Sequence, residues 1–528
     1  MTRLLASLVL LSFAVTSSAA PRLSRADQWW ADIVALASDT NEGRQTGSEG
    51  YLRAAETVER RMRAIGLKPA GERGFRQQVA LEEQRIDYAG SHAALIGADG
   101  GEMSIALGAD MLVSAGGGPV ASRIDAPLVF IGYGLHLPDQ GHDDLAGLDL
   151  RGKIAVIIAG GPADIAGPIK ASNRAERGKL FAKAGALGYI TLTPPAQIEI
   201  PWDRQKLLST QSGMYLADRA LRSTPDAFLS ASFDPAQSER LFAGSGHSFA
   251  ELAALADASA PLPRFALPLR LTASLAAQRH TLTSPNIIAL LPGSDPVLRR
   301  EYVVVSAHLD HVGIGAPING DRIYNGAMDD ASGVAAVLDI AARLKAGRRA
   351  KRSFLFVIVT AEEKGLLGSG YFAKRPTVPK QAIVADLNFD MPLPLWPLTT
   401  VLAQGDHEST LGDAARAVAA RRGLGLIADP LPNRNSFVRT DQYSFVRAGI
   451  PSLAFKFGFP PGSEAFRIEH EWRANRYHAP SDDLDQPGIL RAEAVKLDDY
   501  VAALAMAVAN DPARPRWLPT SVFAHPAD

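Results

Sequence analysis

The stretch Glu301-Tyr-Val-Val-Val-Ser306 has the composition of a buried strand, and the stretch Ala307-His308-Leu309-Asp310-His311 follows it directly. Apolar runs of this kind are typical of strands that are covered on both faces of a sheet. Four similar runs surround it in the sequence: Asn286–Leu291, Ser353–Thr360, Ile383–Phe389 and Ile450–Phe455. Helical patterns lie between or after them: Gly333–Ala346, Leu411–Arg422 and Arg491–Ala509. This alternation predicts an α/β fold, with a mixed, mostly parallel sheet sandwiched by helices.

Imidazole and carboxylate groups follow several of these predicted strands. In an open α/β sheet, ligands bind beyond the carboxyl ends of the strands. Two further segments carry the same residue types, one opening the helix at Gly333 and one late in the chain. The groups in these segments are His308, Asp310, His311, Asp329, Asp330, Glu362, Glu363, Asp390, His478, Asp482 and Asp483. We expect these groups to meet at one edge of the sheet.

Each of these groups also has a simpler explanation when it is taken alone. Asp329 suits the first turn of a helix, because carboxylates stabilise that end. The pair Glu362-Glu363 suits a solvated surface, whereas Asp390, inside an apolar run, must be paired or bind a cation. A metal centre explains all of them at once. The chain has 0 Cys, so any ligands must be His, Asp or Glu, which is zinc-type coordination.

The number of candidate ligands suits two cations. Two ions about 3.5–4 Å apart need an anion between them, and a carboxylate and a water can bridge them. Asp310 lies two residues after His308 on an extended segment, so we expect its carboxylate to accept the free imidazole N–H of His308. Of the pair Glu362-Glu363, one carboxylate would bind metal while the other removes a proton from the water.

The ordered motifs resemble those of the M28 family of dizinc exopeptidases, over about Ser284 to Ala509. They are Ala307 to His311, Gly326 to Gly333, Thr360 to Gly365, Asn388 to Met391 and Tyr477 to Asp483. The resemblance implies a zinc exopeptidase-like fold, two Zn²⁺ ions and peptide substrates. It also implies that His308, Asp329, Glu363, Asp390 and His478 are metal ligands, with Asp329 rather than Asp330 as the bridge. Glu362 would be the general base, and Asp310 the acid that orients His308.

A second resemblance concerns the region before this one. Three stretches are similar to the β-rich protease-associated (PA) domain that is inserted in several members of the family: Ile131 to Gly134, His142 to Ile154 and Ala184 to Ile190. Its role in the family is to cover the catalytic cleft or to bias access to it. One departure lies at Gln442, where many relatives have a histidine that is near the site but is not a metal ligand.

The rest of the sequence predicts the domain organisation. Helices are expected over Ala26–Ser38 and Glu49–Ile65, and short strands and turns from about Gln84 to Asp125. We expect an N-terminal segment packing on the catalytic domain over residues 21–125, a PA-like insertion over 126–270, a catalytic domain over 271–511 and a loosely attached tail over 512–528. Residues 1–20 read as an export signal, with Arg3, the apolar run Leu4–Val15 and small residues at Ser18 to Ala20.

Composition limits the classes of function. With 55 Lys+Arg and 56 Asp+Glu the net charge is −1, which provides no electrostatic footprint for nucleic acid. We expect no stable membrane insertion, because the N-terminal apolar run is shorter than the roughly 20 residues that cross a bilayer. The expected protein is therefore exported, to the periplasm or beyond. Its oligomeric state is left open.

We expect a zinc-dependent exopeptidase, and specifically an aminopeptidase in which Glu362 activates the water between the metals. The nearest alternative is a carboxypeptidase of the same family, which would need cations for its substrate such as Arg434, Arg439 and Arg473. A second alternative is a receptor-like homologue without catalysis, although every expected ligand and the base are present. The third is an acyltransferase of the glutaminyl cyclase type, which uses one metal. Trp396, Trp472 and Tyr477 could line a substrate pocket or simply pack.

Overall fold

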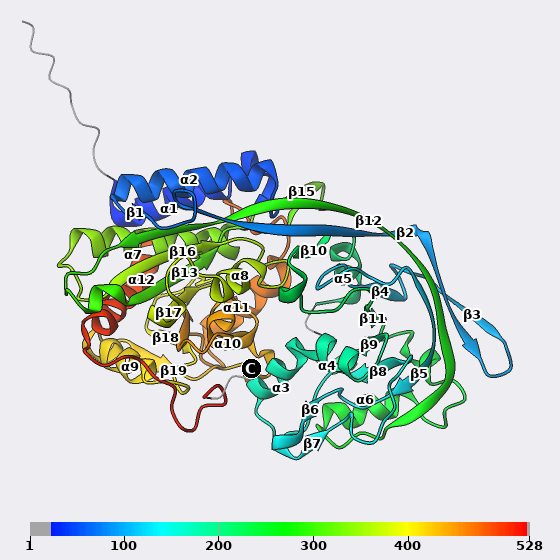
Figure 1. Cartoon of the computed structure of the whole chain (residues 1–528). Coiled ribbons are helices and arrows are strands. Elements are labelled where there is room, and N and C mark those ends of the chain that lie inside the picture. The colour runs from blue at the N-terminus through cyan, green and yellow to red at the C-terminus, as the bar shows by residue number, and fades with distance from the viewer. Residues whose placement is uncertain (1–22, 199, 525–528) are drawn as a thin grey trace, which may run out of the picture.

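The structure is a computed structural model that describes residues 23–198 and 200–524. The predicted export signal, residues 1–20, lies outside the described residues. Within the described ranges, no helix combines the length and apolar character needed to cross a membrane. Figure 1 shows two lobes side by side, connected by two long strands that arch across both.

The first lobe is built on a sheet with the strand order β19-β18-β20-β17-β13-β16-β12. The neighbours β16, β13, β17 and β20 are parallel to one another, whereas β12 and β18 run antiparallel to their neighbours β16 and β20. The predicted mixed, mostly parallel sheet is thus confirmed. Its strands are β12 (Phe265–Leu291), β13 (Tyr302–His308), β16 (Ser353–Val359), β17 (Ile383–Phe389), β18 (Thr400–Gln404), β19 (Gly425–Ile427) and β20 (Ser452–Phe457).

Helices cover both faces of this sheet. Successive side chains of a strand point to opposite faces, so neighbouring residues of one strand pack with different helices. Val303 and Val305 pack with one set of helices, and Val304 packs with the other. The first set is α1 (Arg25–Leu36), α2 (Glu49–Ile65), α7 (Ser332–Ala346), α9 (Leu411–Arg421) and α12 (Arg491–Asn510). The second set is α8 (Leu367–Lys374) and α10 (Gln442–Arg447). The five helices of the first set were expected from the sequence, with ends that differ by at most two residues.

The second lobe continues the sheet in the order β12-β5-β8-β9-β11-β4. The strands from β5 to β11 are parallel, and they lie between α4 on one face and α6 on the other. The elements are β4 (Met111–Val113), β5 (Arg123–Phe130), β8 (Ile154–Ile158), β9 (Gly188–Leu192), β11 (Leu229–Phe233), α3 (Gly167–Ala175), α4 (Arg177–Lys183) and α6 (Phe249–Asp257). Smaller elements are β3 (Glu102–Ile105), β6 (His136–Leu137), β7 (His142–Asp143), β10 (Gly213–Leu216) and α5 (Trp202–Leu208).

Two long strands connect the lobes. β2 (Arg76–Gly97) pairs antiparallel with β12 along almost its whole length, and β1 (Lys68–Pro69) pairs with the far end of β12. The prediction of short strands and turns from Gln84 was therefore wrong for β2. Its partner strand lies about two hundred residues away in the sequence, so the local residue pattern does not indicate the pairing. β12 contains Pro268 where its pairing with β5 shifts register, a place where the missing N–H of proline is tolerated.

The described part of the C-terminal tail is packed against the first lobe. Phe523 is buried and contacts the rings of Phe437 and Trp517, and the Trp517 indole donates a hydrogen bond to the Gly449 carbonyl. The expectation of a loosely attached end was therefore wrong for residues 512–524. The physical reason is that Phe523 in this proline-rich segment is buried and Trp517 is held by a hydrogen bond.

Candidate metal centre

The candidate ligands lie at the carboxyl ends of three parallel strands. His308 ends β13, Asp390 follows β17 directly, and Glu362 and Glu363 follow β16 after a short turn. Asp329 comes from the turn Ala327–Ala331 that precedes α7. His478 comes from the loop after α11 (Glu464–Asn475). Segments that are far apart in the sequence thus converge at one edge of the sheet.

One group consists of His308, Asp329 and Asp390. The Nε2 atom of His308 lies 3.3 Å from Asp329 Oδ1 and 3.9 Å from Asp390 Oδ2. All three side chains are buried, and their ligand atoms lie within 4.8 Å of one another. These are separations that one small cation between the three side chains would need.

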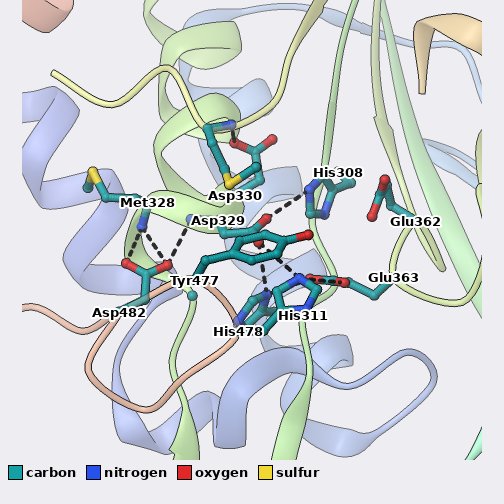
Figure 2. A network of polar contacts seen from close by, with 12 residues as sticks. His308, His311, Met328, Asp329, Asp330, Glu362, Glu363, Tyr477, His478 and Asp482 are labelled. Atoms are coloured by element: carbon teal, nitrogen blue, oxygen red, sulfur yellow. Dashed lines mark hydrogen bonds and ion pairs between the residues drawn. The ribbon is translucent and has the colours of Figure 1, made fainter. Parts of the chain in front are cut away.

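A second group shares Asp329 with the first. His478 Nε2 lies 3.3 Å from Asp329 Oδ2 and 3.0 Å from Glu363 Oε2. His311 Nδ1 approaches the other oxygen of Glu363 to 2.7 Å and Asp329 Oδ2 to 4.0 Å. Figure 2 shows Asp329 between His308 on one side and His311 and His478 on the other. The two oxygens of Asp329 therefore face two separate groups of side chains.

The donor set fits metal ions. The Nε2 atom of His308 and the Oδ1 atom of Asp390 are buried and make no hydrogen bond. Buried polar atoms are normally satisfied, and buried carboxylates are paired or coordinate metal. Imidazole nitrogens and carboxylate oxygens at these separations are the ligands that zinc takes in proteins.

The polypeptide around Asp329 is held by two other acids. The Asp482 carboxylate accepts hydrogen bonds from the backbone N–H groups of Met328 and Asp329, at 2.9 and 3.0 Å. The side chain of Asp330 turns away from the two groups and accepts from the N–H groups of Gly333 and Met391. Asp330 thereby connects the start of α7 to the residue after Asp390.

Asp310 lies under the pair of glutamates rather than beside the imidazole. Its carboxylate accepts hydrogen bonds from the backbone N–H groups of Glu362 and Glu363, at 3.0 and 3.3 Å. The His308 Nδ1 atom instead lies 3.1 Å from the backbone oxygen of Asp310. The expectation that the Asp310 carboxylate accepts the imidazole N–H was wrong, because the chain turns after β13 and points this carboxylate at the turn after β16.

The charges of the cluster perturb one another strongly. Burial, together with the carboxylates of Asp390 and Glu363, raises the pKa of Glu362 well above its ordinary value. Burial alone would lower the pKa of His478, but the adjoining carboxylates of Glu363 and Asp329 raise it to about 10. Despite burial, contact with His308 and His478 keeps the pKa of Asp329 well below its usual range. Cations entering this cluster would therefore compete with protons on the imidazoles.

Two residues at the site, His311 and Asp482, carried no predicted role. His311 and Asp482 lie inside motifs that the sequence singled out, so proximity to a motif was the signal that could have found them. The ring of Tyr477 stacks on His478, with centroids 3.9 Å apart. Gln442 is buried outside both groups, where its side-chain oxygen accepts hydrogen bonds from Asn388 and Thr440.

The second lobe touches the centre at two points. Arg204 of α5 donates hydrogen bonds to the backbone oxygens of Ala474 and Tyr477, next to His478. The ammonium of Lys364, which follows Glu363, donates a hydrogen bond to the backbone oxygen of Ser212 at 3.0 Å. The second lobe thus borders the same edge of the sheet as the candidate ligands.

Comparison with known proteins agrees with this geometry. The Peptidase family M28 profile matches residues 286–505, which contain all of the candidate ligands. The similarity to peptidase family M28 thus extends over this part of the chain. The aminopeptidase from Aneurinibacillus sp. strain AM-1 has a similar fold over 93% of this chain and 95% of its own, with a TM-score of 0.51 and 20% identity. The M28 region thus occupies the zinc exopeptidase-like α/β fold that was expected.

Two curated relatives are aminopeptidases by name, and a third, from Pyricularia oryzae, is named "Probable zinc metalloprotease". "Probable leucine aminopeptidase 2" of Aspergillus fumigatus is 31% identical over 251 residues, which are 44% of this chain and 45% of that protein. "Probable lipoprotein aminopeptidase LpqL" of Mycobacterium tuberculosis is 28% identical over 235 residues, 40% of this chain and 44% of that protein. The chain thus matches less than half the length of each of these two relatives.

Proposed function

We propose that this protein is a zinc-dependent aminopeptidase that removes N-terminal residues from peptides. The observation that carries the proposal is the placement of Asp329, whose two oxygens face two separate groups of imidazole and carboxylate ligands. The similarity of the M28 region to a peptidase family supports peptide hydrolysis. The names of the relatives support an aminopeptidase over a carboxypeptidase.

Two zinc ions are part of the proposal. His308, Asp329 and Asp390 would hold one, and Asp329, Glu363 and His478 would hold the other. Bound zinc supplies a Lewis acid for the scissile carbonyl and lowers the pKa of water towards 7. His311, beside Glu363, would steady the second set of ligands.

Glu362 would carry the proton through the reaction. Its half-buried carboxylate lies beside His308 and Glu363 (Figure 2), and its raised pKa suits a group that accepts a proton and gives it back. We assign to it removal of a proton from the attacking water and delivery of that proton to the leaving amine. Asp310 would hold the turn that carries Glu362 and Glu363, through their two backbone N–H groups.

A recess beside Asp390 would receive the side chain of the residue that is removed. Met391, Trp396, Phe457 and Trp472 are among its apolar walls. Of the cations that a carboxypeptidase could use, Arg434 is paired with Glu469 at 2.7 Å, and Arg473 lies over the Tyr477 ring at 4.4 Å. Arginines already engaged in this way are less suited to capture a substrate carboxylate, which again favours an aminopeptidase.

The domain organisation and the destination of the chain are further proposals. We retain the PA-like insertion, the catalytic domain over 271–511 and export guided by residues 1–20. We move the start of the insertion from residue 126 to about residue 80, because Ile86, Leu95 and Met111 belong to the core of the second lobe. Contacts of that lobe beside His478 support a role in limiting access to the site.

A substrate panel with and without a chelator tests this function. The purified protein should hydrolyse an aminoacyl-anilide and a free dipeptide but not the same dipeptide with a blocked amine. Activity should disappear with a zinc chelator and return with added zinc, and elemental analysis should find two zinc ions per chain. Preference for the blocked peptide would overturn the aminopeptidase assignment, and one zinc ion per chain would overturn the two-metal arrangement.

A further inference from the structure

Arg44 is a buried arginine close to the metal centre but far from it in the sequence. It lies in a short 3₁₀ segment, Asp39–Arg44, outside the region that matches the family. Its side chain is 0% exposed, and no carboxylate of the described residues lies within ion-pair distance of it. A buried guanidinium without a carboxylate is costly unless hydrogen bonds satisfy its N–H groups.

The guanidinium donates to four backbone oxygens. It bonds to Leu309 O at 2.8 Å, between His308 and Asp310. It bonds to Asn325 O and Gly326 O at 2.5 and 2.9 Å, just before the turn that carries Asp329. The fourth acceptor is Leu36 O, at the end of α1. One side chain thus connects the two segments that carry His308 and Asp329.

The backbone of this segment is also fixed against the centre. The Arg44 oxygen accepts a hydrogen bond from the His311 N–H at 3.2 Å, and the Thr46 hydroxyl donates to Asp310 at 3.0 Å. Gly43 has a φ of +65°, and a Cβ there would lie 2.4 Å from the Tyr324 oxygen. Arg44 itself has a φ of 51°, which is unfavourable for a residue with a side chain. Such backbone conformations persist where surrounding contacts hold them in place.

The charge of Arg44 also suits its surroundings. The carboxylates of Asp482, Asp329 and Asp310 act on the guanidinium from the metal centre. A planar guanidinium presents five N–H donors in a fixed arrangement, whereas a lysine ammonium has three at one point. Lysine would keep the charge but could not reach four carbonyl oxygens in different directions.

We propose that Arg44 is a positioning residue of the metal centre, which sets the spacing between the His308 strand end and the Asp329 turn. The inference rests on the proposed function, because it takes both residues as metal ligands. It also means that the N-terminal segment, outside the matched region, completes the site. Arg44 does not contact substrate in this role, so its loss should act on metal affinity and turnover rather than on KM.

The variants R44K and R44M test this role, with R352K as a matched control. Arg352 is also 0% exposed; it donates to backbone oxygens at the end of α12, away from the centre, and is paired with Glu301. Zinc affinity should be measured by chelator competition, and kcat and KM at saturating zinc. We expect R44K and R44M to bind zinc about 10- to 100-fold more weakly and to lose kcat, with KM changed less than about threefold. R352K should lower thermal stability alone.

Two outcomes would overturn the inference. One is an R44K protein that folds and keeps wild-type zinc affinity and kcat. If R44K and R44M do not fold, R44Q decides, because its shorter, neutral side chain cannot connect the same carbonyl oxygens; unchanged zinc affinity and kcat in R44Q would equally overturn the inference. If the wild-type protein binds zinc but cleaves no peptide, the proposed function fails while the zinc affinities still test Arg44.

Discussion

The Nδ1 atom of His311 lies 2.7 Å from Oε1 of Glu363, while the other oxygen of Glu363 lies 3.0 Å from His478. The carboxylate therefore lies between two imidazoles. Oε1 faces His311, and Oε2 faces His478, which also approaches Asp329. His311 thus lies against the second group of side chains even though no role was predicted for it.

Loss of the His311 ring should weaken the second metal position. We expect H311A to bind one of its two zinc ions about 10- to 100-fold more weakly, because side chains that support metal ligands contribute on this scale. Chelator competition measures both affinities. The control is H470A, whose ring lies on α11 near Phe466. Equal zinc affinities for H311A and the wild type would refute the role of His311.

Variants of the adjacent residues Asp329 and Asp330 can identify the acid that is proposed to bridge the metals. D329N should retain less than one zinc ion per chain, because both groups of ligands use its carboxylate. D330N should retain most of its zinc, since Asp330 bonds to backbone N–H groups instead. Elemental analysis of the two purified variants gives the answer. Loss of both ions from D330N alone would reverse the assignment.

Removal of the general base should separate catalysis from metal binding. E362Q keeps the size of the side chain but cannot accept the proton, so kcat should fall about 10²- to 10⁴-fold with zinc content unchanged. E471Q, on the exposed surface of α11, serves as the control and should behave as wild type. An E362Q variant with full turnover would show that another group takes the proton.

Metal removal should also lower stability. A ligand that binds only the folded state, at about 100 times its dissociation constant, stabilises that state by about 2.7 kcal/mol per site. We therefore expect a chelator to lower Tm in the wild type, and to lower it less in D329N. Differential scanning calorimetry provides the measurement. Identical Tm values with and without chelator would contradict a metal centre that is formed by folding.

A buried acid away from the centre predicts the pH dependence of stability. Burial and the neighbouring Asp339 raise the pKa of Asp498 well above its ordinary value, so the folded state holds a proton that the unfolded chain releases. This contribution to stability is complete below the unfolded pKa of about 3.9 and is lost as the pH rises towards the folded pKa. Asparagine imitates the protonated acid and needs no proton.

D498N should therefore be more stable than the wild type at pH 7, by about 1–2 kcal/mol, and the difference should shrink towards pH 4. Urea unfolding at the two pH values measures it. D499N is the control, because Asp499 is paired with Arg25 and Arg343 and its replacement should give no gain. A gain for D498N that is independent of pH would disprove the role of the proton.

Much of the fold could be predicted because its signals are local. β13, β16 and β17 are short apolar runs, and α2 and α7 have apolar residues at helical spacing, so each is recognisable from its own residues. β2 was missed because its partner β12 lies far along the chain. β18 was also not predicted, because it is short and its neighbours β19 and β20 come later in the sequence.

The candidate ligands were found in the sequence because strand ends concentrate chemistry at one edge of a parallel sheet. The direction in which each side chain points was harder to predict. Asp310 illustrates this difference, since its carboxylate reaches the backbone of Glu362 and Glu363 rather than His308. A change in backbone direction at a single residue redirects the side chain that follows, and the spacing of residues in the sequence does not reveal such a change.

The sequence by itself determined the class of fold, the residue types at the centre and the order in which the chain presents them. These properties follow from local hydrophobic patterns and from the chemistry of imidazole and carboxylate. Only the tertiary structure decided that Asp329 faces two groups of ligands, that His311 contacts Glu363 and that Arg44 binds the segments of His308 and Asp329. Those contacts join residues up to hundreds of positions apart, and packing of the whole chain, not any local pattern, brings them together.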